Sequence, residues 1–323
     1  MSIRAPAVLA AILLVPVVAS AAEPSPPPTV DEMRIVLGRR LFHEADLSLD
    51  GTLSCATCHE QKRGFADGNR THPGIHGHPG RRNVPGLANV GRLRNLTWAD
   101  DRLGSLERQA LNPMTGTDPI EMGIGGHEAE VVERLAGDPC YRRLFAAAFP
   151  DGGGRPTMAA VTSAVAAFER TLISTDTAWD RAERAGAPLA DPAAERGRAV
   201  FAAKGCATCH VPPLFTDDAF HVVRRSFAGE TDVGLAAVTG ATADRFAFRT
   251  PGLRDVALTA PYWHDGRAET PSQAFDLHDA DGVRADLTAA DRADLTAFLA
   301  ALTDETLTRA ERFSPPPLAC PLP

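Results

Sequence analysis

The chain has 323 residues, which is enough for two domains of ordinary size and too many for a small disulfide-stapled scaffold. Its 33 Lys and Arg against 41 Asp and Glu give a formal net charge of −8, so we expect no nucleic-acid partner. The composition, 44% hydrophobic and 23% charged, is that of a globular protein and argues against a disordered or multi-span membrane chain.

The N-terminus carries the pattern of an export signal. Arg4 precedes a short apolar run over residues 5–18, and small residues follow at 19–21. A membrane anchor is the alternative, but the run is shorter than the roughly 20 apolar residues that a spanning helix needs, and it contains Pro16. We therefore predict a signal peptide over residues 1–22, cleaved near Ala21-Ala22, and a periplasmic mature protein with no membrane span.

Helices dominate the expected secondary structure. Thr29 and Glu32 form a capping-box pattern that opens the first helix. Apolar periodicity predicts further helices over Glu128–Leu135, over Met158–Ile173 and from Thr288 onward. Period-two alternation is nearly absent, so we expect a mainly α fold with little β structure. Long loops, which are usually functional or wrapped around a bulky group, separate the helices at residues 64–91, 112–126 and 231–250.

Two identical pentapeptides, Cys-Ala-Thr-Cys-His, occupy residues 55–59 and 206–210. C-x-x-C-H is the c-type haem attachment signal, in which two thiols form thioethers and the histidine binds iron. A redox C-x-x-C would need a βαβ context and a zinc site a second close ligand pair, and the sequence offers neither. We therefore predict two covalent c-type haems, held by Cys55, Cys58 and His59 and by Cys206, Cys209 and His210.

The residues before each pentapeptide are repeated as well. Gly38-Arg-Arg-Leu-Phe precedes the first motif, and Gly197-Arg-Ala-Val-Phe precedes the second. A stretch rich in Gly, Pro and Ala lies between the halves at residues 184–194. We predict two cytochrome c-like haem domains with long loops, an N-terminal one over residues 23–188 and a C-terminal one over residues 189–323.

Longer blocks resemble the bacterial di-haem cytochrome c peroxidase and MauG family along nearly the whole mature chain. They are LFHEADLSLDGTLSCATCHEQKRGFADG, RRNVPGLANVG, SLERQALNP, PIEMG and RTPGLRDVALTAPYWHDGRAET, in the family's order. The resemblance implies an enzyme that reacts with hydrogen peroxide at the N-terminal haem and moves electrons through the C-terminal haem. A redox partner protein is implied too, either a protein substrate or a small cytochrome c or copper protein that donates electrons.

The resemblance also assigns residues of the peroxide site. Glu121 in PIEMG matches the family's distal acid–base glutamate, and one positioned carboxylate can move a proton between the two peroxide oxygens. Gln109 and Pro113 resemble residues that line the same pocket. Trp98 matches a tryptophan between the two haems, although the usual Trp-Asp-Gly-Arg reads WADDR here. A surface glutamate and a core tryptophan are the alternative interpretations.

Two metal assignments rest on the resemblance. Asn89 with the backbone carbonyls of Thr259 and Pro261 resembles the family's calcium site, where oxygen ligands suit a hard cation. An asparagine that caps a turn is the alternative. His278 lies fourteen residues after His264, where the family has the sixth ligand of the C-terminal haem, usually Met or Tyr. A second imidazole favours ferric iron and a low potential, so we predict a bis-His haem; an exposed histidine is the alternative.

The sequence leaves alternatives for three features. His72, His76 or His78 could close the resting N-terminal haem, although we favour an open site. Cys140 and Cys320 could form a disulfide, which spacing alone does not establish. A low-potential C-terminal haem favours MauG-like oxidation of a partner protein. A peroxidase with a small electron donor and a non-enzymatic di-haem carrier are the alternatives.

Overall fold

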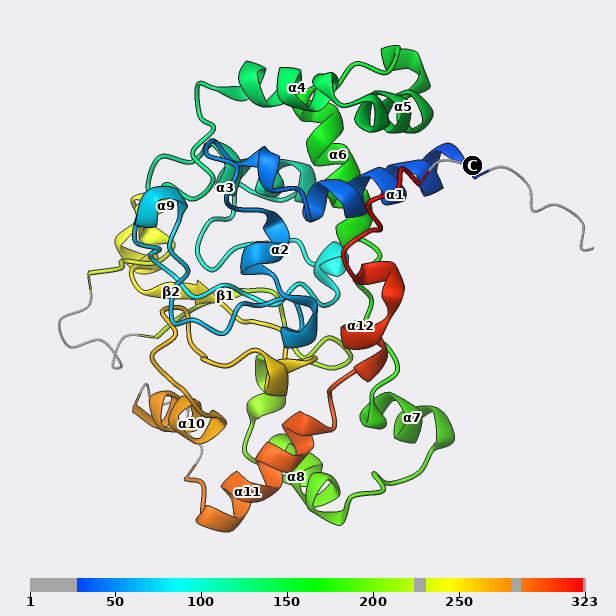
Figure 1. Ribbon diagram of the computed structural model, residues 1–323. Coiled ribbons are helices and arrows are strands. Elements are labelled where there is room, and N and C mark those ends of the chain that lie inside the picture. The colour runs from blue at the N-terminus through cyan, green and yellow to red at the C-terminus, as the bar shows by residue number, and fades with distance from the viewer. Residues whose placement is uncertain (1–27, 224–230, 281–285, 322–323) are drawn as a thin grey trace, which may run out of the picture.

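Helices are the dominant regular secondary structure, as the sequence predicts. The computed structural model describes residues 28–223, 231–280 and 286–321 (Figure 1). The expected signal peptide, residues 1–22, lies outside the described residues. Among the described helices, none has the length and apolar character needed to cross a membrane.

The described helices are joined by long loops and short 3₁₀ turns. The two short strands, β1 (Phe220–Val222) and β2 (Ala247–Arg249), pair antiparallel with Phe220 opposite Arg249. The helices are α1 (Val30–Phe42), α2 (Cys55–Cys58), α3 (Leu106–Thr115), α4 (Glu128–Gly137), α5 (Pro139–Ala148), α6 (Met158–Glu169), α7 (Ala178–Ala185), α8 (Pro192–Ala203), α9 (Ala236–Thr239), α10 (Pro271–Ala280), α11 (Ala289–Ala300) and α12 (Glu305–Arg309).

Helix termini follow local sequence signals. The capping box expected at Thr29 and Glu32 is present, and Thr288 forms another with Asp291 at the start of α11. Helix α6 ends at Glu169, earlier than the periodicity predicts. After Glu169 the backbone tightens into i→i−3 hydrogen bonds, from Thr171 to Phe168 and from Leu172 to Glu169, and the carbonyl of Leu172 accepts from the amide of Asn89.

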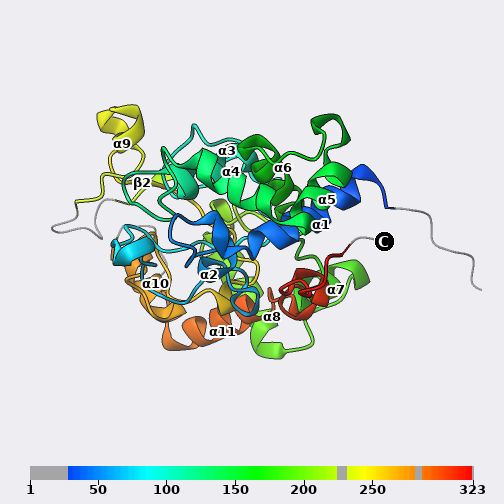
Figure 2. The same ribbon diagram turned by 45° about the horizontal axis from the view of Figure 1, so that its top comes forward.

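The repeated glycines explain how each half is packed. Helix α1 crosses α6 at Gly38, and α8 crosses α11 at Gly197; Figure 2 shows both pairs side by side. A Cβ at Gly38 would lie 1.9 Å from the carbonyl oxygen of Ala164, and one at Gly197 would lie 2.0 Å from that of Asp294. Only glycine allows this close approach of two helix backbones. The repeat therefore marks two equivalent helix crossings.

Two main hydrophobic clusters surround these crossings. The larger one is built on α1, α3, α5 and α6, and the smaller one on α8 and α11. The C-terminal tail leaves the second cluster, because Leu307 and Phe313 are buried in the first. A disulfide between Cys140 and Cys320, with Cα atoms 5.6 Å apart, ties this tail to α5. The division of the chain near residue 188 stays a prediction.

Candidate haem sites

The first pentapeptide forms the short helix α2 and ends in a histidine oriented for metal binding. Nδ1 of His59 lies 2.7 Å from the carbonyl oxygen of Phe65, which therefore accepts its hydrogen bond. A proton fixed on Nδ1 leaves Nε2 as the free donor for a metal. Burial also lowers the pKa of His59, which keeps the ring neutral. His59 therefore offers a neutral ring with a free Nε2, as a histidine that binds a metal would need.

Glu121 lies in a loop that is held from two sides. Its carbonyl oxygen accepts a hydrogen bond from the amide of Ile75, and the next amide, of Met122, donates to the carbonyl of Pro113. Burial raises the pKa of Glu121, and the charge of His72 lowers it in part. Glu121 in turn helps to raise the pKa of the Cys58 thiol, after burial. Glu121 thus lies near the first pentapeptide, with the shifted proton affinity that suits an acid–base group.

The three loop histidines are in different surroundings. His72 is half-buried, and its charge lowers the pKa of both Glu121 and His59 in part. His76 is exposed, with Nδ1 3.6 Å from a carboxylate oxygen of Asp50, and His78 is exposed as well. His72 is therefore the member of this loop that lies beside the first site. Gln109 is half-buried on α3, one turn before Pro113.

The second pentapeptide is completed by a histidine from another part of the chain. Nδ1 of His210 lies 3.1 Å from the carbonyl oxygens of both Phe215 and Pro251. Burial, then the charge of His278, lower the pKa of His210 to about 4. Nδ1 of His278 on α10 lies 2.7 Å from the carbonyl oxygen of Ala274. Both rings therefore keep Nε2 free for a metal.

The spacing of these two rings fits a metal between them. The centres of the His210 and His278 rings are 6.4 Å apart, with 56° between the ring planes. A metal–imidazole bond of about 2 Å, plus roughly 1 Å from nitrogen to ring centre, spans about 6 Å over both sides. His278, selected in the sequence by its spacing from His264, thus lies opposite His210, the histidine of the second motif.

A cavity of about 500 Å³ surrounds these rings, and its lining is mostly apolar. A cavity of this size and polarity suits a largely apolar cofactor, and the donor set on its wall is that of a c-type haem. Both halves of the chain contribute to the wall. The lining includes Asn83, Pro85, Trp98, Cys206, Cys209, His210, Trp263 and His278.

Trp98 lies at the junction of the halves. It is 9% exposed, its Nε1 donates to the carbonyl of Asn83 at 2.8 Å, and its own carbonyl accepts from the amide of Arg249 at 2.8 Å. The side chain clusters with Phe248 on the wall of the cavity that surrounds His210 and His278. This burial fits a core aromatic residue, and a place between two haems stays a prediction.

Asn89 bridges two loops. Its side-chain Nδ2 donates to the carbonyl of Ser174 at 3.1 Å, and its Oδ1 accepts from the amide of Ser174 at 3.2 Å. The side chain makes no cap hydrogen bond to the turn that Asn89 precedes, so its structural role is to join two remote loops and differs from the turn cap given as the alternative. Thr259 and Pro261 line the same cavity as Asn89. Calcium binding at these three residues stays a prediction.

Three buried ionisable residues, Glu169, Asp180 and Arg254, were missed by the sequence analysis. Glu169 is 6% exposed, its Oε2 has no hydrogen-bond partner in the described part of the chain, and burial raises its pKa to about 8. After burial, the charge of Glu169 also helps to raise the pKa of the Cys55 thiol. Asp180 and Arg254 form a buried bidentate pair with two contacts of 2.7 Å. The position of Glu169 at the end of an Ala-rich, otherwise apolar helix was the available signal.

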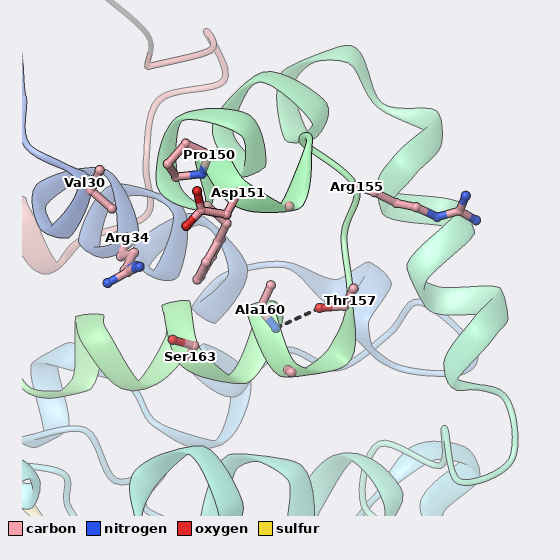
Figure 3. A pocket seen from close by; sticks show the side chains of 11 residues that line it. Val30, Arg34, Pro150, Asp151, Arg155, Thr157, Ala160 and Ser163 are labelled. Atoms are coloured by element: carbon pink, nitrogen blue, oxygen red, sulfur yellow. Dashed lines mark hydrogen bonds between the residues drawn. The ribbon is translucent and has the colours of Figure 1, made fainter.

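A second cavity, of about 690 Å³, lies away from both pentapeptides. Figure 3 shows its lining from α1, α6 and the turn between α5 and α6, including Val30, Arg34, Asp151 and Arg155. None of the predicted site residues is among its lining residues.

Similarity to known proteins identifies the family. A model of the di-haem cytochrome c peroxidase family matches residues 32–187. MauG of Methylorubrum extorquens is 36% identical over 289 residues, 84% of this chain and 78% of the relative. Cytochrome c peroxidase Ccp of Escherichia coli K12 is 34% identical over 278 residues, 84% of this chain and 58% of that relative.

Solved structures agree with this assignment. The crystal structure of a MauG-like protein associated with microbial copper homeostasis superposes with a TM-score of 0.83 and 36% identity, covering 94% of this chain and 99% of that chain. Fold and sites thus define a c-type di-haem enzyme. The chain belongs to the di-haem cytochrome c peroxidase and MauG family, which confirms the resemblance found in its sequence blocks.

Membership in this family has direct consequences. It implies two c-type haems, a peroxide substrate and an electron donor. The two pentapeptides, at residues 55–59 and 206–210, fit the two haems. The protein is a peroxidase of this type, so the alternative of a non-enzymatic carrier is set aside. Its relatives divide between MauG proteins and cytochrome c peroxidases at about 30–36% identity.

Proposed function

We propose that this chain is a MauG-like peroxidase that uses hydrogen peroxide to oxidise residues of a partner protein in the periplasm. The observation that carries the proposal is the opposition of His210 and His278, whose ring centres are 6.4 Å apart. Two imidazole ligands favour ferric iron and a low potential. A site of that kind is poorly suited to collecting electrons from a carrier and better suited to sharing oxidising equivalents.

The proposed ligand assignment follows the two motifs. When bound, the N-terminal haem supplies the iron at which peroxide is reduced, with two electrons and two protons giving two molecules of water. The electrons come from aromatic side chains of the partner. The attachment and axial residues are Cys55, Cys58 and His59 for the N-terminal haem, and Cys206, Cys209, His210 and His278 for the C-terminal haem.

Glu121 moves the proton in this proposal. Its carboxylate accepts the proton from the near oxygen of peroxide and returns it to the far oxygen, so that the far oxygen leaves as water. Its raised pKa makes the carboxylate a stronger base than that of an exposed glutamate, which favours the first transfer, from peroxide to Glu121. Gln109 and Pro113 line the same pocket, and Trp98 stands between the haems.

The test is the reaction of the ferric protein with peroxide under single-turnover conditions. We expect Glu121→Gln to slow it by about 10²- to 10⁴-fold, the usual contribution of a positioned acid–base group, with haem spectra unchanged. The pH dependence due to this carboxyl should vanish in the same variant. Glu130→Gln, at an exposed position on α4, is the matched control. An unchanged rate in Glu121→Gln would refute the role of Glu121.

A second candidate function is a peroxidase that takes electrons from a small cytochrome or copper protein. The position of His72 beside Glu121 favours it, because a histidine there could close the first site until the protein is reduced. Electron paramagnetic resonance (EPR) of the oxidised protein separates the two. One high-spin and one low-spin ferric signal supports the MauG-like proposal. Two low-spin signals, with one converted to high-spin in His72→Ala, support the peroxidase.

Two further assignments complete the proposal. The N-terminal haem domain extends over residues 23–188 and the C-terminal one over residues 189–323, after removal of a signal peptide. One calcium ion binds at Asn89 with the carbonyls of Thr259 and Pro261. Equilibrium dialysis against ⁴⁵Ca²⁺ tests this site, and a wild-type protein that binds no calcium above the level of Asn89→Ala would exclude it.

A further inference from the structure

Trp263 has a backbone conformation that aromatic residues rarely adopt. Its φ is +81°, in the left-handed region, where a bulky side chain is a true outlier. Such a conformation persists only where the surrounding structure imposes it, and it concentrates at functional sites. The structure around Trp263 must therefore hold its backbone in this conformation.

A tight turn holds Trp263 in place. The turn is closed by a pair of backbone hydrogen bonds between Tyr262 and Ala268, of 2.6 and 3.2 Å. Inside it, the amide of Gly266 donates to the carbonyl of Trp263 at 3.1 Å. Residues 262–268 thus impose the conformation at Trp263.

This turn is fastened to the N-terminal half of the chain. A Cβ at Gly266 would lie 2.4 Å from the carbonyl oxygen of Arg70, so the two backbones are in close contact. The amide of Asn83 donates to the carbonyl of His264 at 2.8 Å. The side chain of Arg70 also donates to the carbonyl of Asp265 at 3.1 Å. The loop over residues 69–83 therefore anchors the turn from the other half.

The indole of Trp263 meets the imidazole of His278 edge to face. The ring centres are 5.0 Å apart and the planes are at 86°. The imidazole has a second contact, from Nδ1 to the carbonyl of Ala274 at 2.7 Å. Nε1 of Trp263 is buried with no hydrogen-bond partner in the described part of the chain. No hydrogen bond in the described structure therefore holds the indole, and packing sets its position.

We propose that Trp263 is a positioning residue for His278, which it holds against the Ala274 contact so that Nε2 faces His210 across the cavity. The inference rests on the proposed function in one respect, that an iron lies between His210 and His278. Trp263 acts through His278 and does not itself touch the metal. A turn anchored on the N-terminal half thereby controls how firmly the C-terminal site keeps its sixth ligand.

The test measures how easily an external ligand displaces His278. Cyanide is titrated into the oxidised holoprotein, and the low-spin EPR signal of the C-terminal haem is followed. The free energy of an edge-to-face aromatic contact corresponds to about a threefold to tenfold change in the equilibrium constant for displacement of His278. We expect Trp263→Ala to lower the cyanide concentration for half-displacement by that factor. Trp263→Phe, which keeps an aromatic ring, should stay within about twofold of wild type.

Further variants separate positioning from damage to the fold. Glycine adopts positive φ at little cost, so Trp263→Gly should melt no lower than Trp263→Ala and still show the cyanide shift. The N-terminal haem serves as the internal reference, and its cyanide affinity should not change. Equal half-displacement in wild type, Trp263→Ala and Trp263→Gly would overturn the proposal, as would an equal shift at both haems.

The variant His278→Ala tests the underlying ligand assignment separately. Loss of the low-spin signal in this variant supports His278 as the ligand. Retention of the signal overturns the ligand assignment and, with it, the role of Trp263.

Discussion

The two helix crossings allow a matched test of the internal repeat. Gly38→Ala places a methyl group 1.9 Å from the carbonyl oxygen of Ala164, whereas an ordinary contact needs at least 3.4 Å. Helices α1 and α6 must therefore separate by about 1.5 Å. A gap of even 0.5–1 Å forfeits a quarter to a half of the dispersion energy of each contact across it. We expect a loss of about 3 kcal/mol, at the upper end for overpacking.

Gly197→Ala should cost a similar amount at the crossing of α8 and α11, because its methyl group would lie 2.0 Å from the carbonyl oxygen of Asp294. Gly137→Ala is the control, since no atom lies within 4 Å of the added methyl group; this change should be neutral or slightly stabilising. The assay is guanidinium denaturation followed by circular dichroism, with EPR to report each haem. Equal stability of the Gly38 and Gly137 variants would refute the packing argument.

Three more predictions concern groups outside the haem motifs. Cys320→Ser should lower the free energy of unfolding by about 2–4 kcal/mol, and a reductant should do the same to wild type, since the Cys140–Cys320 disulfide closes a separation of 180 residues. Asp180→Asn should cost about 3 kcal/mol in thermal denaturation, because it leaves the buried Arg254 charge without its carboxylate; a loss below 1 kcal/mol would contradict this. The pKa of Glu169 is about 8 in the folded state against 4.5 in the unfolded state. Between these two values the folded protein keeps a proton on Glu169 that the unfolded chain has lost. Stability should therefore fall between about pH 5 and 8 by up to about 1.4 kcal/mol per unit, and Glu169→Gln should flatten this slope in denaturation curves measured across that range.

The turn that contains Trp263 is one of the contacts between the two halves of the chain. The loop over residues 69–83 carries His72, which lies beside Glu121, and the same loop anchors the turn that places Trp263 against His278. One segment of chain therefore borders both candidate haem sites. A substitution in this loop should be examined at both haems, even when it lies next to only one of them.

The sequence by itself determined the features that depend on contiguous residues. A haem attachment motif is complete within five residues, so Cys55–His59 and Cys206–His210 could be read directly. The capping box at Thr29 and the repeated Gly38 and Gly197 are equally local signals. The fold class follows from helical periodicity, and the family from the order of the longer blocks.

Only the tertiary structure decided the features that depend on distance between remote segments. It showed that His72 is the one of the three loop histidines that lies beside Glu121. It also paired Cys140 with Cys320 and brought Ser174 to the side-chain amide of Asn89. The burial that raises the pKa of Glu169 depends on how α6 packs against the rest of the first cluster, which no local pattern encodes. The spacing of His278 suggested a ligand, but its place opposite His210 results from how α10 packs onto the second half.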